Sequence, residues 1–203
     1  MTIHVDNHIP NANVVVNRLD DGDISIQIFE NSGVALGSVE CGKTVKIGER
    51  EFIVLGHGKD TTAVITKDAV CEMKFGENGD WRDSDVRKFC NGKFYDELAS
   101  VIGKENIVQH TVNLIADDGT GKGIVCKDNI SILTNDLYRR YRPFLSAFGN
   151  WWWTATRVTH DNSIGYSRGV CCVGSSGILS WGVCDYCWSV RPFCILNSSI
   201  LVS

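Results

Sequence analysis

Alternating apolar and polar positions predict β-strands in the first third of the chain. The stretch VVVNRLDDGDISIQIFE, residues 14–30, alternates on both sides of a DDGD segment. Asp and Gly tolerate the positive φ of a tight turn, so we expect a β-hairpin here. A second alternating stretch, residues 42–70, predicts two or three further strands separated by Gly-rich turns.

Helical spacing replaces this alternation between residues 81 and 99. Ser84 or Asp83 can cap a helix there, because either side chain accepts a hydrogen bond from a free backbone N–H. The apolar positions that follow at helical spacing are Val86, Phe89, Cys90, Phe94 and Leu98. The first three share one face and the last two begin a second stripe, so the segment predicts one or two helices.

A shorter helix is predicted further along the chain. LTNDLYRRYRPFL offers Thr134 or Asn135 as its cap, and the helix should end before Pro143. HTVNLIADDGT and GIVCKDNISIL predict short strands or loops. The order of hairpins, one or two helices, irregular loops and then strands indicates an α+β fold rather than alternating β-α-β units.

Length, composition and net charge indicate the number of domains and exclude some classes of partner. The chain has 203 residues, 43% of them hydrophobic, and a net charge of −4. We expect an N-terminal β extension at residues 1–40 and one main domain at residues 41–203. The acidic balance argues against a nucleic-acid partner, and no apolar run is long enough for membrane insertion. The N-terminus lacks the basic start and apolar core of a signal peptide.

The C-terminal tail has an unusual composition. Residues 158–203 contain no Lys, Glu, Gln or Met, although the first 157 residues contain 22 of them. Cys, Ser, Gly, Trp, Tyr and Val are abundant instead, as in SRGVCCVGSSGILSWGVCDYCWSV. Aromatic residues among small, turn-forming ones are typical of adaptable binding loops such as antibody paratopes. The tail is therefore the candidate binding region.

Several separated segments together resemble one known family. They are GEREFIVLG, the pattern W-R-x-S-x-V-R-x-F-x-N-x-x-F-Y at residues 81–95, SILTNDLYRRY, WWWTATR and SVRPFCILNSS. In this order they are similar to a domain family of uncharacterised function found in gut Firmicutes and their phages. That family is related to the formylglycine-generating-enzyme-like branch of the C-type lectin fold. The resemblance covers about residues 40–203 and implies a short antiparallel sheet, two helices and long irregular loops.

Some relatives in that family are the variable proteins of diversity-generating retroelements. In these systems an error-prone reverse transcriptase replaces adenines, so that Asn codons scatter to Tyr, Ser, Cys, Gly, Val and others. Those codons cannot reach Lys, Glu, Gln, Met or Trp, and the tail lacks the first four types. Trp181 and Trp188 depart from this pattern. The resemblance thus implies a hypervariable surface within about residues 158–190.

Our leading hypothesis is a non-enzymatic protein that binds a protein or cell-surface ligand through this surface, and a phage-encoded receptor-binding role is compatible with it. It needs no cofactor and no metal, and an oligomer is compatible with it. Gly174 and Gly177 would fix the loop geometry while neighbouring positions vary. The expected ligand-binding residues are Ile164, Tyr166, Arg168, Cys171, Ile178, Ser180, Trp181, Val183, Cys184, Tyr186, Cys187 and Trp188.

Two alternatives stay open. Cys171, Cys172, Cys184 and Cys187 are a candidate set of metal-binding thiolates, and formylglycine-generating enzymes are copper oxidases that use a cysteine pair. An adjacent Cys pair suits tetrahedral chelation poorly, and the C-x-x-C lacks the usual knuckle Gly. The second alternative is a structural virion protein whose tail packs against a neighbouring subunit.

Other prominent residues have structural interpretations. The WWW run at residues 151–153 predicts buried strand core, because each indole covers a large apolar area. Arg157 and Arg191 are expected to make structural charge-assisted hydrogen bonds, and Cys194 to lie in the core. The five histidines show no ligand-like spacing.

Overall fold

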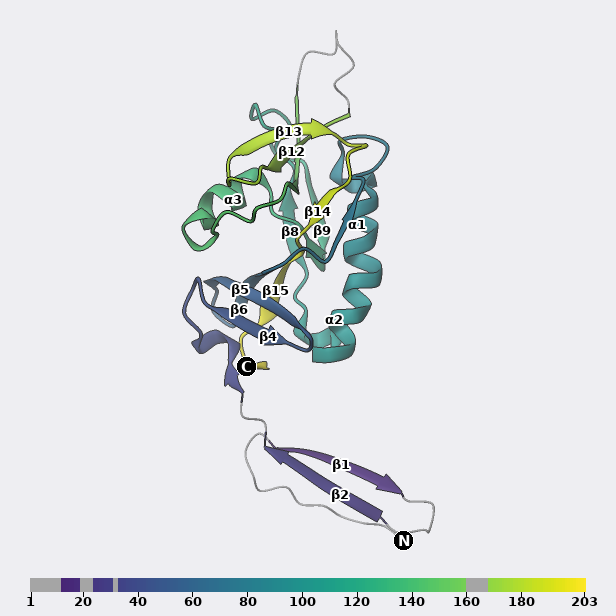
Figure 1. Ribbon diagram of the computed structural model, residues 1–203, viewed down its shortest axis with the longest axis vertical. Helices are drawn as coiled ribbons and strands as arrows, with labels where there is room; N and C mark the ends of the chain where they lie inside the picture. Colours follow the sequence, from purple (N-terminus) through teal and green to yellow (C-terminus); the bar gives the residue numbers. More distant parts are fainter. Residues whose placement is uncertain (1–11, 19–23, 31–32, 160–167) are drawn as a thin grey trace.

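The computed structural model describes residues 12–18, 24–30, 33–159 and 168–203. It has an α+β architecture of mostly antiparallel sheets with two principal helices (Figure 1). The fold class predicted from the order of elements is therefore confirmed.

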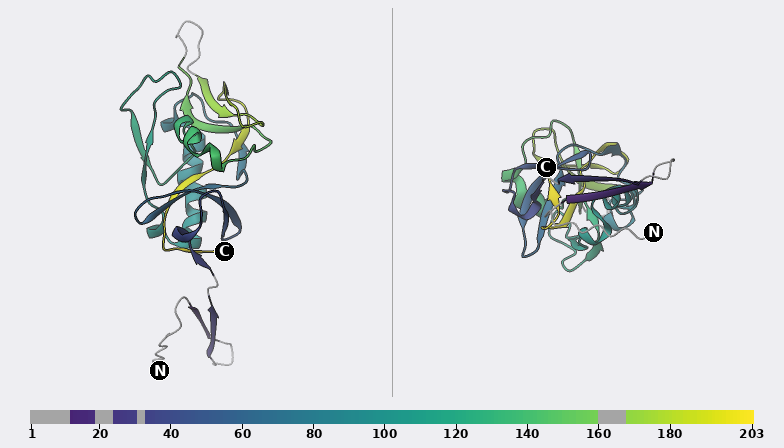
Figure 2. Two further views of the ribbon diagram at one scale, coloured as in Figure 1. Left: turned by 90° about the vertical axis from the view of Figure 1, so that its left-hand side faces the viewer. Right: turned by 90° about the horizontal axis from the view of Figure 1, so that it is seen from below.

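The predicted N-terminal hairpin is present. Strand β1 (Ala12–Arg18) pairs with β2 (Ile24–Glu30) in antiparallel register, and no other strand of the described residues joins this sheet. The hairpin lies beyond the end of the body that carries the C-terminus (Figures 1 and 2).

The body begins earlier than the expected boundary at residue 40. Strand β3 (Val34–Ala35) pairs with β16 (Leu201–Val202), the last strand of the chain. Leu36, in the 3₁₀ turn η1 (Leu36–Ser38), is fully buried. Residues 34–38 are therefore held against the C-terminal end of the body.

One five-stranded sheet has the order β10-β15-β6-β5-β4, and all its neighbouring strands are antiparallel. Three of its strands come from the alternating stretch that predicted them, and β15 contains the FCIL segment with the buried Cys194. Its strands are β4 (Thr44–Ile47), β5 (Arg50–His57), β6 (Thr61–Thr66), β10 (Ile130–Ser131) and β15 (Phe193–Asn197).

The second five-stranded sheet has the order β13-β12-β11-β14-β7 and is built mainly from the tail and the WWW segment. Its pairs are antiparallel except for β11 and β14. Its strands are β7 (Cys71–Met73), β11 (Trp152–Arg157), β12 (Gly169–Val173), β13 (Leu179–Val183) and β14 (Trp188–Val190). Two five-stranded sheets exceed the single short sheet implied by the resemblance.

The first helix is continuous across three segments, α1 (Asp85–Phe89), the π turn η3 (Cys90–Phe94) and α2 (Tyr95–Ile102). Its cap is Ser84, whose Oγ accepts a hydrogen bond from the backbone N–H of Arg87 at 3.0 Å. The buried residues recur every four positions, at Val86, Cys90, Phe94 and Leu98. Four-residue spacing drifts around an α-helix of 3.6 residues per turn, and the wider π turn counteracts that drift.

The second helix, α3 (Asn135–Tyr141), begins and ends as predicted. Its cap is Thr134, whose Oγ1 accepts a hydrogen bond from the N–H of Leu137 at 3.2 Å. Pro143 lies in the following 3₁₀ turn. The remaining elements are η2 (Trp81–Asp83), η4 (Lys104–Asn106), β8 (His110–Asn113), β9 (Val125–Asp128) and η5 (Arg142–Phe144).

Two hydrophobic clusters stabilise the body. The larger one contains the inner face of the first helix with Trp81, Phe75 and Trp153, and the smaller one contains Tyr138 of α3 and Trp152. Burial of such aromatic side chains contributes roughly 2–3 kcal/mol each before entropic costs. Within the described ranges, no helix combines the length and apolarity that a membrane crossing requires.

Candidate functional site

The WWW run is divided between the two faces of the second sheet. Trp152 is 1% exposed and its ring meets that of Tyr138 edge-on at 5.5 Å, on the side of α3. Trp153 is 0% exposed and packs in the larger cluster on the opposite face. Trp151, just before β11, is 41% exposed. The expectation of buried core is confirmed for Trp152 and Trp153 and is wrong for Trp151.

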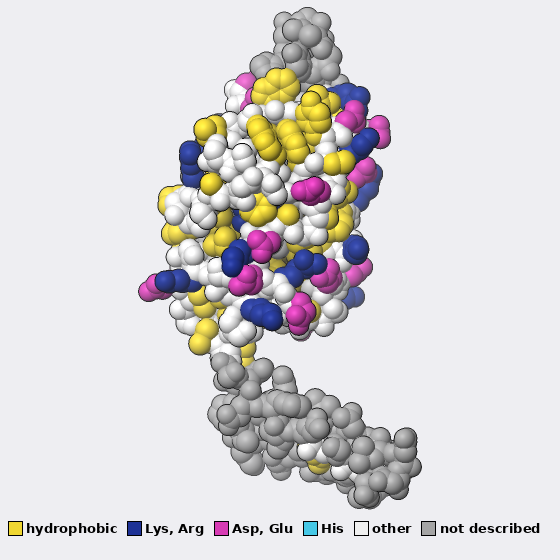
Figure 3. Space-filling view, viewed as in Figure 1, with side chains coloured by type: hydrophobic (Ala, Val, Ile, Leu, Met, Phe, Trp, Pro, Cys, Tyr) yellow, Lys and Arg dark blue, Asp and Glu magenta, His cyan; other side chains and the backbone are white. Residues whose placement is uncertain are grey.

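Trp151, Tyr186 and Trp188 together form what we call the aromatic platform. The ring centroids of Trp151 and Trp188 are 5.3 Å apart with planes at 26°, and those of Tyr186 and Trp188 are 5.3 Å apart at 36°. Tyr186 is 53% exposed and Trp188 is half-buried. Hydrophobic side chains gather at this end of the body, around β13 and β14 (Figure 3). Three residues from two separated segments therefore present one aromatic surface.

Two buried residues, Trp153 and Gly182, pack against Trp188 of the aromatic platform. The ring of Trp153 lies 4.4 Å from that of Trp188, and its Nε1 donates a 3.0 Å hydrogen bond to the carbonyl of Met73. Gly182 leaves room for the Trp188 ring, since a Cβ atom there would lie 2.2 Å from it. Close packing on both sides restricts the rotamer of Trp188, so the platform is preorganised.

An ion pair involves Asp185, the residue that directly precedes Tyr186 of the platform. Arg168 and Asp185 form an ion pair at the surface, and each side chain is a little less than half exposed. The carbonyl of Arg168 accepts a 2.9 Å hydrogen bond from the N–H of Cys184, which fixes the turn before Tyr186. The rim is therefore polar, but the aromatic platform itself carries no charge.

The expected ligand-binding residues do not all lie on this surface. The register pairs Cys172 with Ser180 and Cys171 with Trp181, and neighbouring residues of a strand alternate between faces. Ser180 thus shares the face of the buried Cys172 and the platform. Trp181 shares the other face with Cys171, toward α3. The surface expected to be continuous is therefore divided between two faces.

Two expected positions require correction. Cys171 is 3% exposed and Cys184 is 0% exposed, so neither thiol can contact a ligand at the surface. Ile164 and Tyr166 lie outside the described residues. The remaining expected residues are at least partly accessible: Arg168, Ile178, Ser180, Trp181, Val183, Tyr186, Cys187 and Trp188.

The cysteines do not converge on a common site. None of the nine, all of which lie in the described ranges, forms a disulfide. Burial raises the pKa of Cys171 to about 11 and that of Cys172 to about 12, so both keep their protons. A metal requires thiolates. In the described part of the chain, no group of three or more His, Cys, Asp or Glu side chains is arranged to hold a metal ion.

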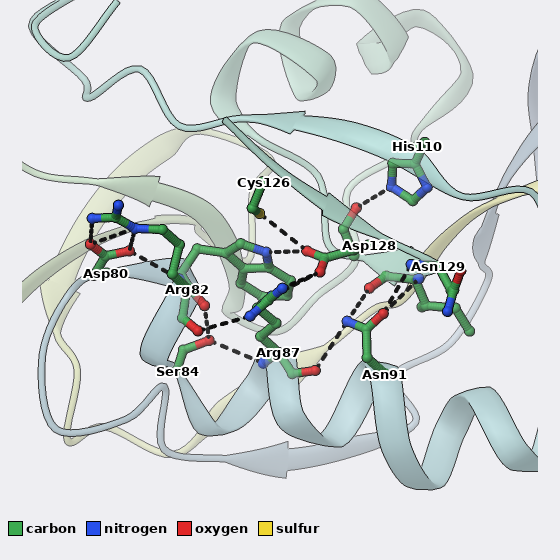
Figure 4. Close-up of polar contacts among 12 residues, drawn as sticks. Asp80, Arg82, Ser84, Arg87, Asn91, His110, Cys126, Asp128 and Asn129 are labelled. Carbon is green, nitrogen blue, oxygen red and sulfur yellow. Dashed lines mark hydrogen bonds and ion pairs between the residues drawn. The ribbon is translucent and has the colours of Figure 1, made fainter. Parts of the chain in front are cut away.

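The motif at residues 81–95 forms a buried polar centre, the Asp128 network of Trp81, Arg87, Cys126 and Asp128 (Figure 4). Trp81 Nε1 donates to Asp128 Oδ2 at 2.7 Å, and Arg87 Nε donates to Asp128 Oδ1 at 2.8 Å. Cys126 Sγ is 3.4 Å from Oδ2. Asp128 is 2% exposed, so this carboxylate stabilises the packing of the first helix against β9.

Asn91 of the same motif extends this connection. Its Nδ2 donates to the carbonyl of Ile130 at 2.8 Å, and its Oδ1 accepts from the N–H groups of Asn129 and Ile130 (Figure 4). The side chain thus satisfies backbone groups next to β10. We interpret the motif as structural because its polar groups bind other parts of the body.

Arg191 is also structural, as predicted. It is 2% exposed and donates to the carbonyls of Thr66 and Lys67. Its guanidinium lies 4.6 Å from the ring centroid of Phe148 and 5.1 Å from that of Trp152. Burial lowers its pKa to about 10. The Arg157 side chain is exposed, and the backbone carbonyl of Arg157 accepts a 3.1 Å hydrogen bond from the N–H of Asp117.

A polar hollow of about 270 Å³ lies near α3. Its polar groups bind one another: Asn135 Oδ1 accepts from Thr154, the Asn135 N–H donates to Thr156, and Arg139 pairs with Asp136. The aromatic platform, in contrast, exposes large rings. It is therefore the stronger candidate for a ligand surface.

Comparisons of the chain with protein-family models, with curated proteins and with solved structures found no match. A functional assignment therefore depends on the residues of the platform and on the composition of the tail.

Proposed function

We propose that this chain is a non-enzymatic binding protein with a C-type-lectin-like scaffold and that the aromatic platform is its ligand surface. One observation carries the proposal: the exposed ring of Trp151 stacks on Trp188, the exposed ring of Tyr186 lies tilted against it, and the buried Trp153 supports it. A protein or another cell-surface component is the ligand class that such a flat surface suits.

The physical reason is the low entropic cost of ordering aromatic side chains. Trp and Tyr offer large contact areas with few rotatable bonds, and they dominate the binding energy of many interfaces. Here Gly182 and Trp153 already restrict Trp188 before any ligand arrives. The Arg168–Asp185 pair adds polar groups at the rim, where they favour selectivity over affinity.

The proposal includes rewriting of the tail by a diversity-generating retroelement. The absence of Lys, Glu, Gln and Met from residues 158–203 supports it. The structure also gives Trp188 a scaffold role beside Gly182, which accounts for a residue that rewritten Asn codons cannot encode. The test is a search of the adjacent DNA for a near-duplicate of the tail codons, differing at adenines, beside a reverse transcriptase gene. Its absence would remove this part of the proposal.

Binding is tested with matched aromatic substitutions on the two faces. Tyr186→Ala removes a platform ring that is 53% exposed, and Trp181→Ala removes one on the other face that is 43% exposed. The probe is a panel of intact bacterial cells, and the readout is the binding of fluorescently labelled purified protein. For any cell type that binds, we expect Tyr186→Ala to weaken binding about tenfold or more, with Trp181→Ala close to wild type.

Equal loss by both variants would contradict the platform as the ligand surface. Unchanged binding by Tyr186→Ala would contradict it as well. If Tyr186→Ala instead abolishes incorporation into virions, the platform serves subunit packing. If tightly bound zinc or copper accompanies the purified protein, the cysteine-based alternative gains support.

A further inference from the structure

The polar hollow near α3 is bounded by two structured segments. Its volume is about 270 Å³, which has room for about nine water molecules at roughly 30 Å³ each. One wall is the start of α3, and the other is the segment of residues 113–119. The Asp117 N–H donates to the Arg157 carbonyl at 3.1 Å, and Asp117 Oδ1 accepts from the N–H of Thr159 at 2.7 Å. These bonds fix the second wall in place.

Two buried hydroxyl groups supply hydrogen-bond donors to the hollow. Thr134 and Thr156 line it and are 5% and 3% exposed. Thr134 Oγ1 accepts from the N–H of Leu137 at 3.2 Å, and Thr156 Oγ1 accepts from the N–H of Asn135 at 2.9 Å. A hydroxyl group has one donor in addition to its acceptor sites. Since both hydroxyls act as acceptors in these bonds, each keeps its O–H for another group.

Carboxylates supply acceptors to the same hollow. Three aspartates and one arginine line it: Asp117, Asp118, Asp136 and Arg139. Arg139 pairs with Asp136 at 2.8 Å, so two further carboxylates have no cation among the lining residues. Hydrogen bonds from Thr120 lower the pKa of Asp118, which is therefore charged at neutral pH. A carboxylate has about four acceptor sites, so each aspartate can accept more hydrogen bonds than it does within the chain.

This combination of groups restricts the chemistry of a ligand. The ligand must accept hydrogen bonds from threonine hydroxyls and donate them to carboxylates, and hydroxyl groups do both. A phosphate or a carboxylate would meet an excess of like charge. An apolar molecule would remove water from polar groups without replacing their hydrogen bonds. A polyol without negative charge meets both requirements.

We propose that the polar hollow is a second binding site, which takes a non-anionic polyol the size of a hexose or an amino hexose. It is separate from the aromatic platform. The helix α3 packs on the face of the second sheet that carries Trp152, whereas Trp188 of the platform packs on Trp153 of the opposite face. The inference therefore does not rest on the proposed function.

The first test is titration of the full chain with glucose, galactose and mannose and with their 2-amino derivatives. Nuclear magnetic resonance spectra of ¹⁵N-labelled protein report binding, and at least one sugar should saturate with a Kd of about 0.1–10 mM. The amides of residues 117–119 and 134–136 should shift most. Failure of all six sugars to saturate overturns the proposal, as do shifts confined to other parts of the chain.

The second test compares ligand charges on one sugar ring. For the sugar that binds best, the amino form should bind about three- to tenfold tighter than the neutral hexose, and the uronic acid at least tenfold weaker. Asp117→Asn removes a negative charge and should reduce the preference for the amino form. Arg139→Gln removes the positive charge and should increase it. The matched control is Asp96→Asn, an exposed aspartate of α2, which should leave the preference unchanged.

The ratio of the two affinities separates a charge effect from damage to the fold, because damage weakens both sugars alike. Equal changes of the preference in Asp117→Asn and Arg139→Gln overturn the site. Tight binding of the uronic acid overturns its charge selectivity. If Tyr186→Ala abolishes sugar binding, the sugar occupies the aromatic platform and the hollow is not its site.

Discussion

The Asp128 network and the aromatic platform are both built around tryptophan, but they use it in opposite ways. In the network, Trp81 is 1% exposed and its Nε1 donates to a buried carboxylate. In the platform, Trp151 is 41% exposed and its ring stacks on another ring. The first arrangement satisfies polar groups in the interior. The second leaves apolar area accessible to a ligand.

This contrast separates stability from recognition. Removing a member of the Asp128 network leaves a buried donor or charge without its partner, which is costly. Removing an exposed platform ring such as Tyr186 loses little packing, so stability should barely change. Under the proposed function, exposed positions of the platform can vary because the network and the two clusters fix the body. Trp188, which packs against Gly182 at the base of the platform, differs from Tyr186 because its substitution should reduce stability, as for buried residues of the body.

The largest expected effect on this comparison is the loss of stability in the variant Asp128→Ala. The variant leaves Trp81 Nε1 and Arg87 without their buried acceptor, since the Asp128 side chain is 1% exposed. We expect a loss of about 3 kcal/mol in the free energy of unfolding. Chemical denaturation followed by circular dichroism measures it. The matched control is Asp85→Ala, a half-exposed aspartate on the helix that carries Arg87, which should lose much less.

If Asp128→Ala and Asp85→Ala prove equally stable, the Asp128 network does not hold the body together. The motif at residues 81–95 would then need a functional interpretation instead of a structural one.

A smaller effect is expected from Gly182→Ala, which tests the base of the platform. The new Cβ would lie 2.2 Å from the Trp188 ring, so the ring must move. We expect a loss of about 1–3 kcal/mol in unfolding free energy and a changed near-ultraviolet circular dichroism spectrum. Gly92→Ala is the matched control because a Cβ there meets nothing within 4 Å, and alanine favours the helix.

An unchanged spectrum for Gly182→Ala would show that Trp188 is not held in one position. The platform would then be adaptable rather than preorganised, and its binding would carry a larger entropic cost.

Local signals in the sequence predicted much of the fold. The caps at Ser84 and Thr134 and the hairpin of β1 and β2 appear as expected, because each depends on residues only a few positions apart. Pairing between Val34 and Val202 joins the two ends of the described body, and no local pattern announces it. The prediction of one or two helices left the continuity of the first helix open, because its π turn joins two apolar stripes that look separate.

The candidate site was less predictable. The sequence predicts Cys171 and Cys184 at the surface because they lie in the part of the tail whose composition resembles that of rewritten Asn codons. Both residues are buried. Strand β12 lies between β13 and β11 in its sheet and is buried at all five positions, so its GVCCV sequence is apolar throughout. Trp151 was missed as a surface residue, since three consecutive tryptophans give no indication of where the strand leaves the core.

The smallest expected effect is on the pH dependence of the unfolding free energy. It would identify a residue of the body that makes the fold sensitive to acid. His110 is 9% exposed, its Nε2 lies 2.9 Å from Ser131 Oγ, and its ring meets Phe193 edge-on at 5.4 Å. Burial lowers the pKa of His110. Between that lowered pKa and the unfolded value of about 6.5, the unfolded chain binds more protons than the folded one.

Stability from His110 is therefore complete above about pH 6.5 and declines as the pH falls below it. His110→Gln removes the titrating group, so its unfolding free energy should fall less steeply than that of wild type between about pH 6.5 and 5. The comparison of slopes needs only denaturation curves at several pH values, and each protein's value at about pH 7.5 serves as its reference. Parallel slopes would show that the burial of His110 does not disfavour its charged form. Acid sensitivity would then have to arise elsewhere in the body.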